Sequence, residues 1–174
     1  MENNVFGKRD VQQALKIIMT ADYYTQHIQC TREEKLECLH VVKDLLVLAF
    51  AAKEEGFLKM DELLRDRFRF QDKFLCRAAG IVVETADQEN VEEVLYNLIF
   101  TSSEMGNNKF FKNVLIAETM LSLGRGEDLD YIFAYLVPSF FGVEYVDQVE
   151  ELYYQSKRAH LSQKDGTPPE NEKF

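Results

Sequence analysis

The chain is poor in residues that break helices or crosslink a fold. Its 174 residues include three prolines, eight glycines, three cysteines and no tryptophan. So little Pro and Gly excludes a collagen-like or low-complexity chain, and an odd number of cysteines without framework spacing excludes a disulfide scaffold. A chain of this length buries about 70% of its unfolded surface, so it needs no metal or disulfide to fold. We expect one domain in a reducing compartment.

Long apolar runs are also missing. The longest, LLVLAFAA at residues 45–52, is much shorter than the roughly 20 residues of a membrane-spanning helix. The first ten residues, MENNVFGKRD, lack the apolar core of a signal peptide. We therefore expect a cytoplasmic protein that does not cross a membrane.

Basic residues are outnumbered, with 20 Lys and Arg against 30 Asp and Glu and a formal net charge of −10. This charge argues against general nucleic-acid binding, because phosphates would be repelled. The charge is also segregated. Residues 78–104 carry six acids and residues 126–156 carry seven, both without a base, whereas residues 65–77 carry five bases and two acids. Such segregation favours contact with another charged surface.

Apolar residues recur at helical spacing along most of the chain, and Leu, Glu, Lys and Ala are abundant. The predicted helices cover approximately residues 10–29, 31–55, 57–66, 71–85, 91–105, 109–123, 129–137 and 145–160. The pattern predicts a compact all-α domain of seven or eight helices over residues 1–161, followed by a mobile polar tail over residues 162–174.

Several helix boundaries have local signals. Thr31 with Glu34, and Asn90 with Glu93, are spaced for a capping box at two helix starts. Gly56 should end the helix over 31–55, because glycine best tolerates a left-handed exit.

Two further features predict which helix is central and where another helix ends. The run at 45–52 is apolar on almost every side, so the helix that contains it should be central. Pro138 should end the helix that follows Asp128, because proline costs roughly 3 kcal/mol inside a helix.

Residues 88–99, QENVEEVLYNLI, have an echo 38 positions later in residues 126–137, GEDLDYIFAYLV. An apolar stripe behind an acidic helix start gives such a match without any shared ancestry. A period of about 40 residues is also typical of helix-pair repeats, although solenoids usually need three copies or more. Both interpretations stay open.

Four potential zinc ligands, His27, Cys30, Cys38 and His40, lie within fourteen residues. Structural zinc sites place their ligands in close pairs such as C-x2-C on facing elements. Cys38 and His40 stand two apart on one predicted helix and point to different sides of it. We expect core thiols and surface histidines here, and no metal.

Glu37 and His40 form one Glu-x-x-His element of the type that four-helix di-iron proteins use in pairs. The other candidate is His160, where Lys157 stands in place of the glutamate. The pair is incomplete, so we expect no cofactor.

Common catalytic motifs are absent, since the sequence contains no G-x-x-x-x-G-K, G-x-S-x-G or G-x-G-x-x-G. We therefore favour a protein that is not an enzyme. The alternative is a small-ligand-binding protein or an enzyme with a pocket between helices, because such sites can be assembled from residues distant in sequence.

The basic stretch RDRFRFQDKFLCR at residues 65–77 interleaves arginines with phenylalanines. Such a pattern can bind nucleic acid by stacking, but the overall charge favours an acidic protein surface, either of a partner or of this chain itself. Self-association is a second expectation, because the aromatics of YLVPSFFGVEY at residues 135–145 would form an apolar patch unless they pack under the last helix.

Residues 46–64, LVLAFAAKEEGFLKMDELL, and the following FLCRAAGIVVETADQENVEEVLYNLI carry a family resemblance. Residues 46–99 resemble the cytoplasmic segment of flagellar motor stator A subunits (MotA-type). In that family a basic and an acidic residue of this element face the rotor. The resemblance assigns these places to Lys53 and Asp61, where the family favours Arg and Glu. The chain lacks the four transmembrane helices of that family, so the resemblance implies docking and not torque generation.

These observations together predict a non-enzymatic protein–protein interaction or scaffold module that acts through charged helix faces. A protein partner is expected. The candidate contact residues are Lys53, Asp61, Arg65, Arg67 and Arg69.

Overall fold

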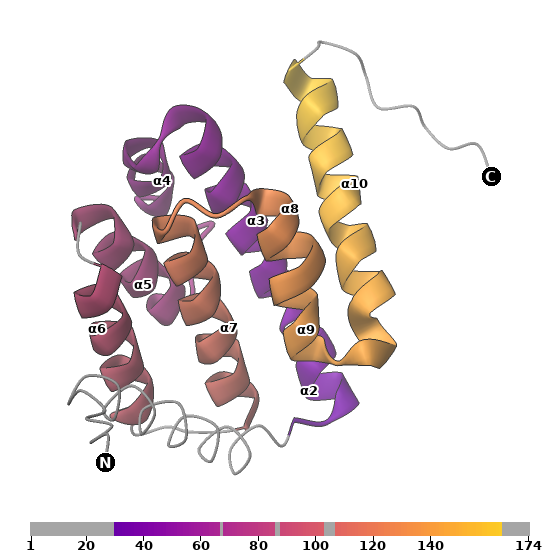
Figure 1. Ribbon diagram of the computed structural model, residues 1–174, viewed down its shortest axis with the longest axis horizontal. Coiled ribbons are helices and arrows are strands. Elements are labelled where there is room, and N and C mark those ends of the chain that lie inside the picture. The colour runs from indigo at the N-terminus through magenta and orange to yellow at the C-terminus, as the bar shows by residue number, and fades with distance from the viewer. Residues whose placement is uncertain (1–29, 67, 86–87, 103–106, 165–174) are drawn as a thin grey trace, which may run out of the picture.

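The computed structural model describes residues 30–66, 68–85, 88–102 and 107–164, and these form an all-α domain without strands (Figure 1). The elements are α2 (Arg32–Glu37), α3 (Leu39–Glu55), α4 (Phe57–Leu64), α5 (Lys73–Glu84), α6 (Gln88–Phe100), α7 (Asn107–Gly124), α8 (Leu129–Tyr131), the π-helical η1 (Ile132–Leu136), α9 (Val137–Phe141), the 3-10 turn η2 (Val143–Tyr145) and α10 (Val146–Lys164). The predicted all-α class is confirmed. The predicted helix over residues 10–29 lies outside the described residues.

Helix α7 is the centre of the fold. It packs against α5 and α6 on one side, against η1 and α9 on the other, and against α3 behind them (Figure 1). Its buried apolar side chains are Phe110, Phe111, Val114, Leu115, Ile116, Ala117, Met120, Leu121 and Leu123. Because neighbours surround it, α7 buries residues on almost every side, including the polar Asn113, Thr119 and Ser122.

Helix α3 is the second buried helix, and it contains the apolar run that the sequence placed at the centre. Its buried residues are Val41, Val42, Leu45, Leu46, Leu48, Ala49, Phe50 and Ala51. It packs against α4, α7 and α10. The prediction of a central helix over 45–52 is therefore confirmed, but α7 shares that position and was not singled out.

Two of the predicted helix signals are confirmed. The N–H of Thr31 donates to Glu34 Oε2 at 2.7 Å, and the N–H of Glu34 donates to Thr31 Oγ1 at 3.3 Å, which completes the capping box. Gly56 ends α3 with a φ of +88°, a value that side chains other than glycine rarely adopt. The chain reverses there and enters α4 directly, so α3 and α4 pack together.

The predicted start of the helix after residue 90 is wrong. Helix α6 begins at Gln88, so Asn90 and Glu93 lie inside the helix and not at its cap. Acidic side chains are favourable anywhere in the first turn of a helix, where they face the positive end of its dipole. A composition that suits the first turn therefore does not fix the first residue.

The predicted end near Met105 is also wrong, because α6 ends at Phe100. The hydroxyl groups of the next two residues hydrogen-bond back into the helix. Thr101 Oγ1 donates to the carbonyl of Asn97 at 2.7 Å, and Ser102 Oγ donates to that of Leu98 at 2.9 Å. The Asn97 carbonyl also accepts the N–H of Thr101, so the hydroxyl bond there adds to the helical bond and does not replace it.

The predicted break before Pro138 is wrong as well. The helical path from Leu129 continues to Phe141, and it passes through the π-helical turn η1 just before the proline. There the N–H of Val137 donates to the carbonyl of Ile132, five residues back. This wider turn relieves the clash between a proline ring and the carbonyl four residues before it. The path ends at Gly142, with a φ of +98°.

The last helix is longer than predicted, since α10 ends at Lys164 and not near His160. Among the residues described in α10, only Val149 and Tyr153 are buried. None of the helices in the described ranges is long and apolar enough to span a membrane.

Candidate functional site

A groove between α4 and α5 has a volume of about 650 Å³. We call it the basic groove. It is lined by Asp61, Leu64, Arg65, Phe70, Gln71, Lys73, Cys76 and Gly80. A volume of this size lies within the range of ligand-binding pockets in proteins.

Helical spacing explains why these residues meet. Lys73, Cys76 and Gly80 stand three and four positions apart, so they share one face of α5. Asp72 caps that helix by accepting the N–H groups of Phe74 and Leu75, each at 2.9 Å. The cap fixes where α5 begins and therefore which of its faces looks into the groove.

Gly80 keeps the floor of the groove open. It lies in the middle of α5, and a Cβ atom built on it would meet no atom within 4 Å. Glycine costs about 1 kcal/mol relative to alanine inside a helix, and here neither its backbone angle nor a close neighbour requires it. A larger side chain at this position would instead occupy space in the groove.

The turn between α4 and α5 carries a highly exposed aromatic side chain. Phe68 is 94% exposed. Its N–H and that of Arg69 both donate to Asp66 Oδ1, at 3.1 and 3.3 Å, which fixes the turn locally. Phe70, two residues later, is buried and carries the Arg69 guanidinium 5.4 Å from its ring centre.

Two acidic residues near this groove, Asp61 and Asp72, form salt bridges within the domain. Asp61 pairs with Arg65 at 2.8 Å, and Asp72 pairs with Lys112 at 2.5 Å. Burial alone would raise the pKa of Asp72, but hydrogen bonds from Lys112 and from the backbone outweigh burial and lower it, so this carboxylate is ionised at neutral pH.

Three exposed bases in or near the groove form no salt bridge with another described residue. Lys73 lines the groove, Arg69 lies in the adjoining turn with Asp44 as an electrostatic neighbour, and Arg77 stands one turn after Lys73 on α5. The groove therefore presents positive charge in a chain whose net charge is −10.

The five predicted contact residues do not all meet. Asp61 and Arg65 line the basic groove, and Arg69 lies in the turn next to it. Lys53 is exposed near the end of α3 and lines a different hollow. Arg67 lies outside the described residues.

That second hollow, which we call the His160 cleft, has a volume of about 210 Å³ between α3, α8 and α10. It is lined by Phe50, Lys53, Glu54, Asp128, Leu129, Asp130, Tyr153, Lys157, His160 and Leu161. The His160 ring stacks on Phe50, with ring centres 4.6 Å apart, and its Nε2 lies 2.8 Å from Glu54 Oε2. These contacts hold α10 against the end of α3.

A second polar cluster lies in the same cleft. The Tyr153 hydroxyl and the Lys157 ammonium both donate to Asp130 Oδ1, each at 2.6 Å. Burial and the hydrogen bond to Asp130 raise the pKa of Tyr153 to about 12, so the phenol stays protonated. Hydrogen bonds from Lys157 and Tyr153 lower the pKa of Asp130.

Of the cysteines and histidines considered as metal ligands, the half-buried Cys30 lies near Cys38, which it affects electrostatically. Cys38 is buried between α2 and α3, where its thiol donates to the carbonyl of Glu34, and His40 is exposed on α3. Burial raises the pKa of Cys38 to about 11, which keeps the thiol protonated. His27 lies outside the described residues. Within the described ranges, no three His, Cys, Asp or Glu side chains are placed to hold a metal ion.

Sequence reasoning missed the apolar floor of the basic groove, namely Leu64, Phe70, Cys76 and Gly80. The one sequence signal for this groove was Gly80, a glycine in the middle of a helix where no turn requires it. It also missed the pairing of Glu54 with His160, which are 106 residues apart and carry no shared local pattern. Comparison of the chain with models of protein families, with curated proteins and with solved structures finds no match.

Proposed function

We propose that this protein is a docking module that binds an acidic, amphipathic helical segment of a protein partner in the basic groove. The observation that carries the proposal is a groove with an apolar side, at Leu64 and Cys76, next to Lys73, an exposed base that forms no salt bridge with another described residue. A partner that carries both carboxylates and a large apolar side chain would match the rim and the floor at once.

The energetics of such an interface divide between floor and rim. Burial of the partly exposed floor residues Leu64 and Cys76 against a partner supplies most of the affinity, since a few buried apolar contacts usually dominate binding. The exposed charges on the rim give orientation and a faster association rate, and salt weakens their effect. Binding should therefore weaken, without disappearing, as ionic strength rises.

Gly80 provides the sharpest test. A displayed library of acidic amphipathic helical peptides is selected for binding to the wild-type chain, and the selected peptides are titrated by fluorescence anisotropy against Gly80→Leu and Gly80→Ala. We expect Gly80→Leu to weaken binding at least about tenfold, because its side chain fills the floor. Gly80→Ala keeps most of the space and should bind nearly as well. Equal binding by the two variants would overturn the proposal.

A second pair of variants tests the rim. Lys73→Glu with Arg77→Glu reverses two exposed bases of α5, of which Lys73 lines the groove, and Lys43→Glu with Arg158→Glu reverses two exposed bases elsewhere. Both pairs change the net charge equally. We expect the first pair to weaken peptide binding at least about tenfold at low salt, and the second to change it little. Similar losses in both would mean that only the overall charge matters.

The resemblance to stator A subunits stays a prediction, and it points to the same class of function. It assigns docking to Lys53 and Asp61. Asp61 borders the basic groove, whereas Lys53 borders the His160 cleft. If the resemblance holds, a partner would either contact both hollows, and so both Lys53 and Asp61, or contact only one of these two residues.

A second candidate function is the binding of a small ligand in the His160 cleft. It is supported by two polar clusters, Glu54–His160 and Asp130–Tyr153–Lys157, that meet at one hollow between helices. A fragment library screened by ligand-observed NMR should give hits that are lost in His160→Ala and kept in His40→Ala, which changes an exposed histidine. A screen without hits, or hits that survive His160→Ala, would remove this candidate.

A further inference from the structure

The last helix is anchored in the core along only its first half. Among the described side chains of α10, those of Val149 and Tyr153 are buried, and both lie in that half. None of the side chains described from position 154 to position 162 is buried. In Figure 1 this end of α10 rises beyond α8. Because so few buried apolar contacts hold it, the second half should open at a lower free energy than the rest of the domain.

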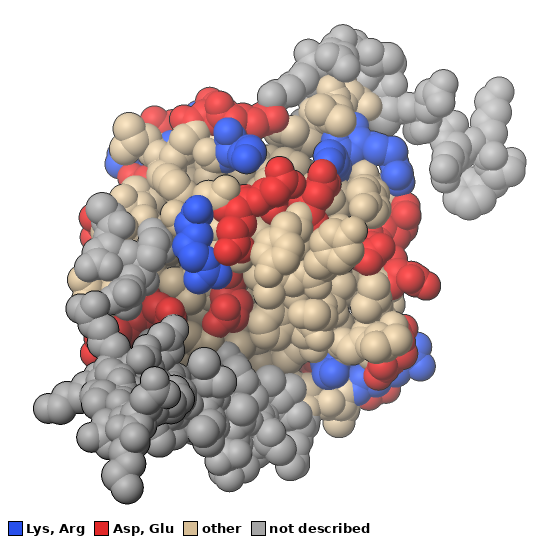
Figure 2. Space-filling view, viewed as in Figure 1, with Lys and Arg blue, Asp and Glu red and all other residues tan. Residues whose placement is uncertain are grey.

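Polar and aromatic contacts with α3 and α8 hold this second half in place. The His160 ring stacks on Phe50, with ring centres 4.6 Å apart and planes at 6°, and its Nε2 lies 2.8 Å from Glu54 Oε2. One turn earlier, the Lys157 ammonium donates to Asp130 Oδ1 at 2.6 Å. Figure 2 shows basic side chains at the end of α10 beside acidic side chains of α8. Both ion pairs are partly exposed, so each adds little stability by itself.

The second half of α10 also forms one wall of the His160 cleft. Lys157, His160 and Leu161 line the cleft from α10. Phe50 and Leu129 line it from α3 and α8, and each of these two side chains is only 9% exposed. If residues 154–164 moved away from α3, the cleft would widen and both apolar side chains would become accessible.

We propose that residues 154–164 act as a lid on the His160 cleft. The lid opens by local unfolding of these turns, while Tyr153 stays buried and keeps the first half of α10 packed. The contacts of His160 with Phe50 and Glu54 hold the lid closed. This inference concerns a different site from the basic groove. It rests on the second candidate function only for the identity of the ligand, because the opening itself needs none.

Hydrogen exchange of the full-length protein without ligand, followed by mass spectrometry, tests the lid. We expect the amides of residues 154–164 in the wild type to be protected, yet to exchange at least about tenfold faster than those of residues 148–153. Amides of the lid without any protection would mean that no closed state exists. Equal protection of the two halves would mean that α10 opens only as one unit. Either result overturns the inference.

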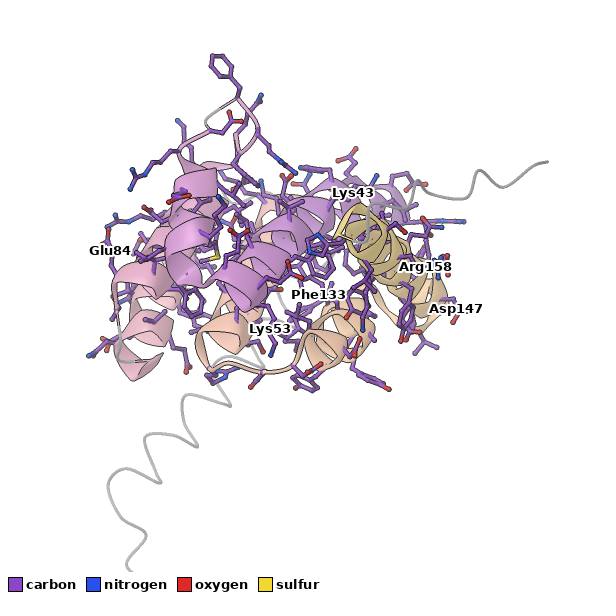
Figure 3. All side chains as sticks on the ribbon, turned by 90° about the horizontal axis from the view of Figure 1, so that it is seen from above. Lys43, Lys53, Glu84, Phe133, Asp147 and Arg158 are labelled. Carbon is purple, nitrogen blue, oxygen red and sulfur yellow. The ribbon has the colours of Figure 1, made fainter. Side chains whose placement is uncertain are left out.

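Two alanine variants on the same helix show what holds the lid. His160→Ala removes the contacts with α3, whereas Arg158→Ala removes an ion pair with Glu151 that lies within α10 itself. Figure 3 places Arg158 on the outer side of α10. Alanine favours a helix at both positions, so the helix propensity changes in the same direction.

The two variants should differ clearly. We expect His160→Ala to speed the exchange of residues 154–164 by about tenfold, through loss of the stacked ring and the hydrogen bond, and to leave residues 148–153 unchanged. Arg158→Ala should change the exchange of the lid by less than about twofold. Equal effects of the two variants would show that His160 does not hold the lid. Faster exchange along the whole of α10 in His160→Ala would show that its two halves are not independent.

The outcomes separate the lid from the proposed functions. A fragment screen without hits removes the second candidate function, but exchange measured without ligand still decides whether the lid exists. Fragments that do bind should slow the exchange of residues 154–164 in the wild type, because a ligand in the cleft stabilises the closed state. Fragments that bind in the cleft and leave this exchange unchanged would show that the lid does not cover the site. The peptide titrations on the basic groove bear on neither result.

Discussion

Replacement of Phe111 by alanine should lower the free energy of unfolding by about 3–5 kcal/mol, the usual cost of removing a buried phenylalanine side chain. Phe111 is completely buried on α7 and packs edge-on against Phe141, with ring centres 5.3 Å apart and the rings at 88°. The cavity would lie where α7 meets α9, so neighbouring side chains cannot collapse into it without moving a central helix.

Urea denaturation followed by circular dichroism measures this loss, and the midpoint of thermal unfolding should fall by roughly 6–20 °C for a domain of this size. Phe68→Ala is the matched control, because it removes the same side chain from a position that is 94% exposed. It should change the stability by less than about 0.5 kcal/mol. A loss below about 1 kcal/mol for Phe111→Ala would show that α7 is not the centre of the fold.

The helices themselves were predictable because their signals are local. The helical spacing of apolar residues predicted the helices. The capping box at Thr31 and the glycine at position 56 predicted one helix start and one helix end, and the structure confirms both. The errors in helix boundaries arose where the surrounding structure outweighed a local sequence signal. A π-helical turn accommodates Pro138, and the acidic composition around residue 90 did not fix the first residue of α6, which begins at Gln88.

The central place of α7 could not be predicted because polar residues stand among its apolar ones on more than one side of the helix. Asn113, Thr119 and Ser122 suggest solvated positions, yet all three are buried. Thr119 turns its hydroxyl back to the carbonyl of Leu115 at 2.7 Å, which hides its polarity within the helix. A short polar side chain that bonds to its own helix needs no contact with water.

The candidate site also has a part that could be predicted from the sequence and a part that could not. Arginines and acids in the stretch 65–77 were visible in the sequence, because charge segregation is a property of composition. The groove was not, because it forms only where α4 and α5 pack together, with Gly80 lining it from α5. The His160 cleft was still harder to predict from the sequence, since its residues come from three helices that only the tertiary fold brings together.

Asp72→Ala should lower the stability at pH 7 by about 2–4 kcal/mol. Loss of the cap on α5 accounts for about 1 kcal/mol. The remainder, about 1–3 kcal/mol, comes from Lys112, whose ammonium would be left without its partner at a side chain that is only 23% exposed. Asp72→Asn keeps a capping side chain and removes only the charge, so it should lose the second contribution alone.

The pH dependence of this loss has a definite sign. The folded state lowers the pKa of Asp72 below its ordinary value of 3.8, so the stability that this carboxylate supplies is fully present above that value and is lost as the pH falls through the folded pKa. The difference in unfolding free energy between wild type and Asp72→Ala should thus be constant above about pH 5 and shrink below it. Subtraction of the two curves removes the contribution of Asp130, whose pKa is also lowered and which both proteins retain. A difference that stayed constant down to the acid unfolding of the protein would show that the pair with Lys112 contributes nothing, and that Asp72 acts only as the cap that sets the face of α5 in the groove.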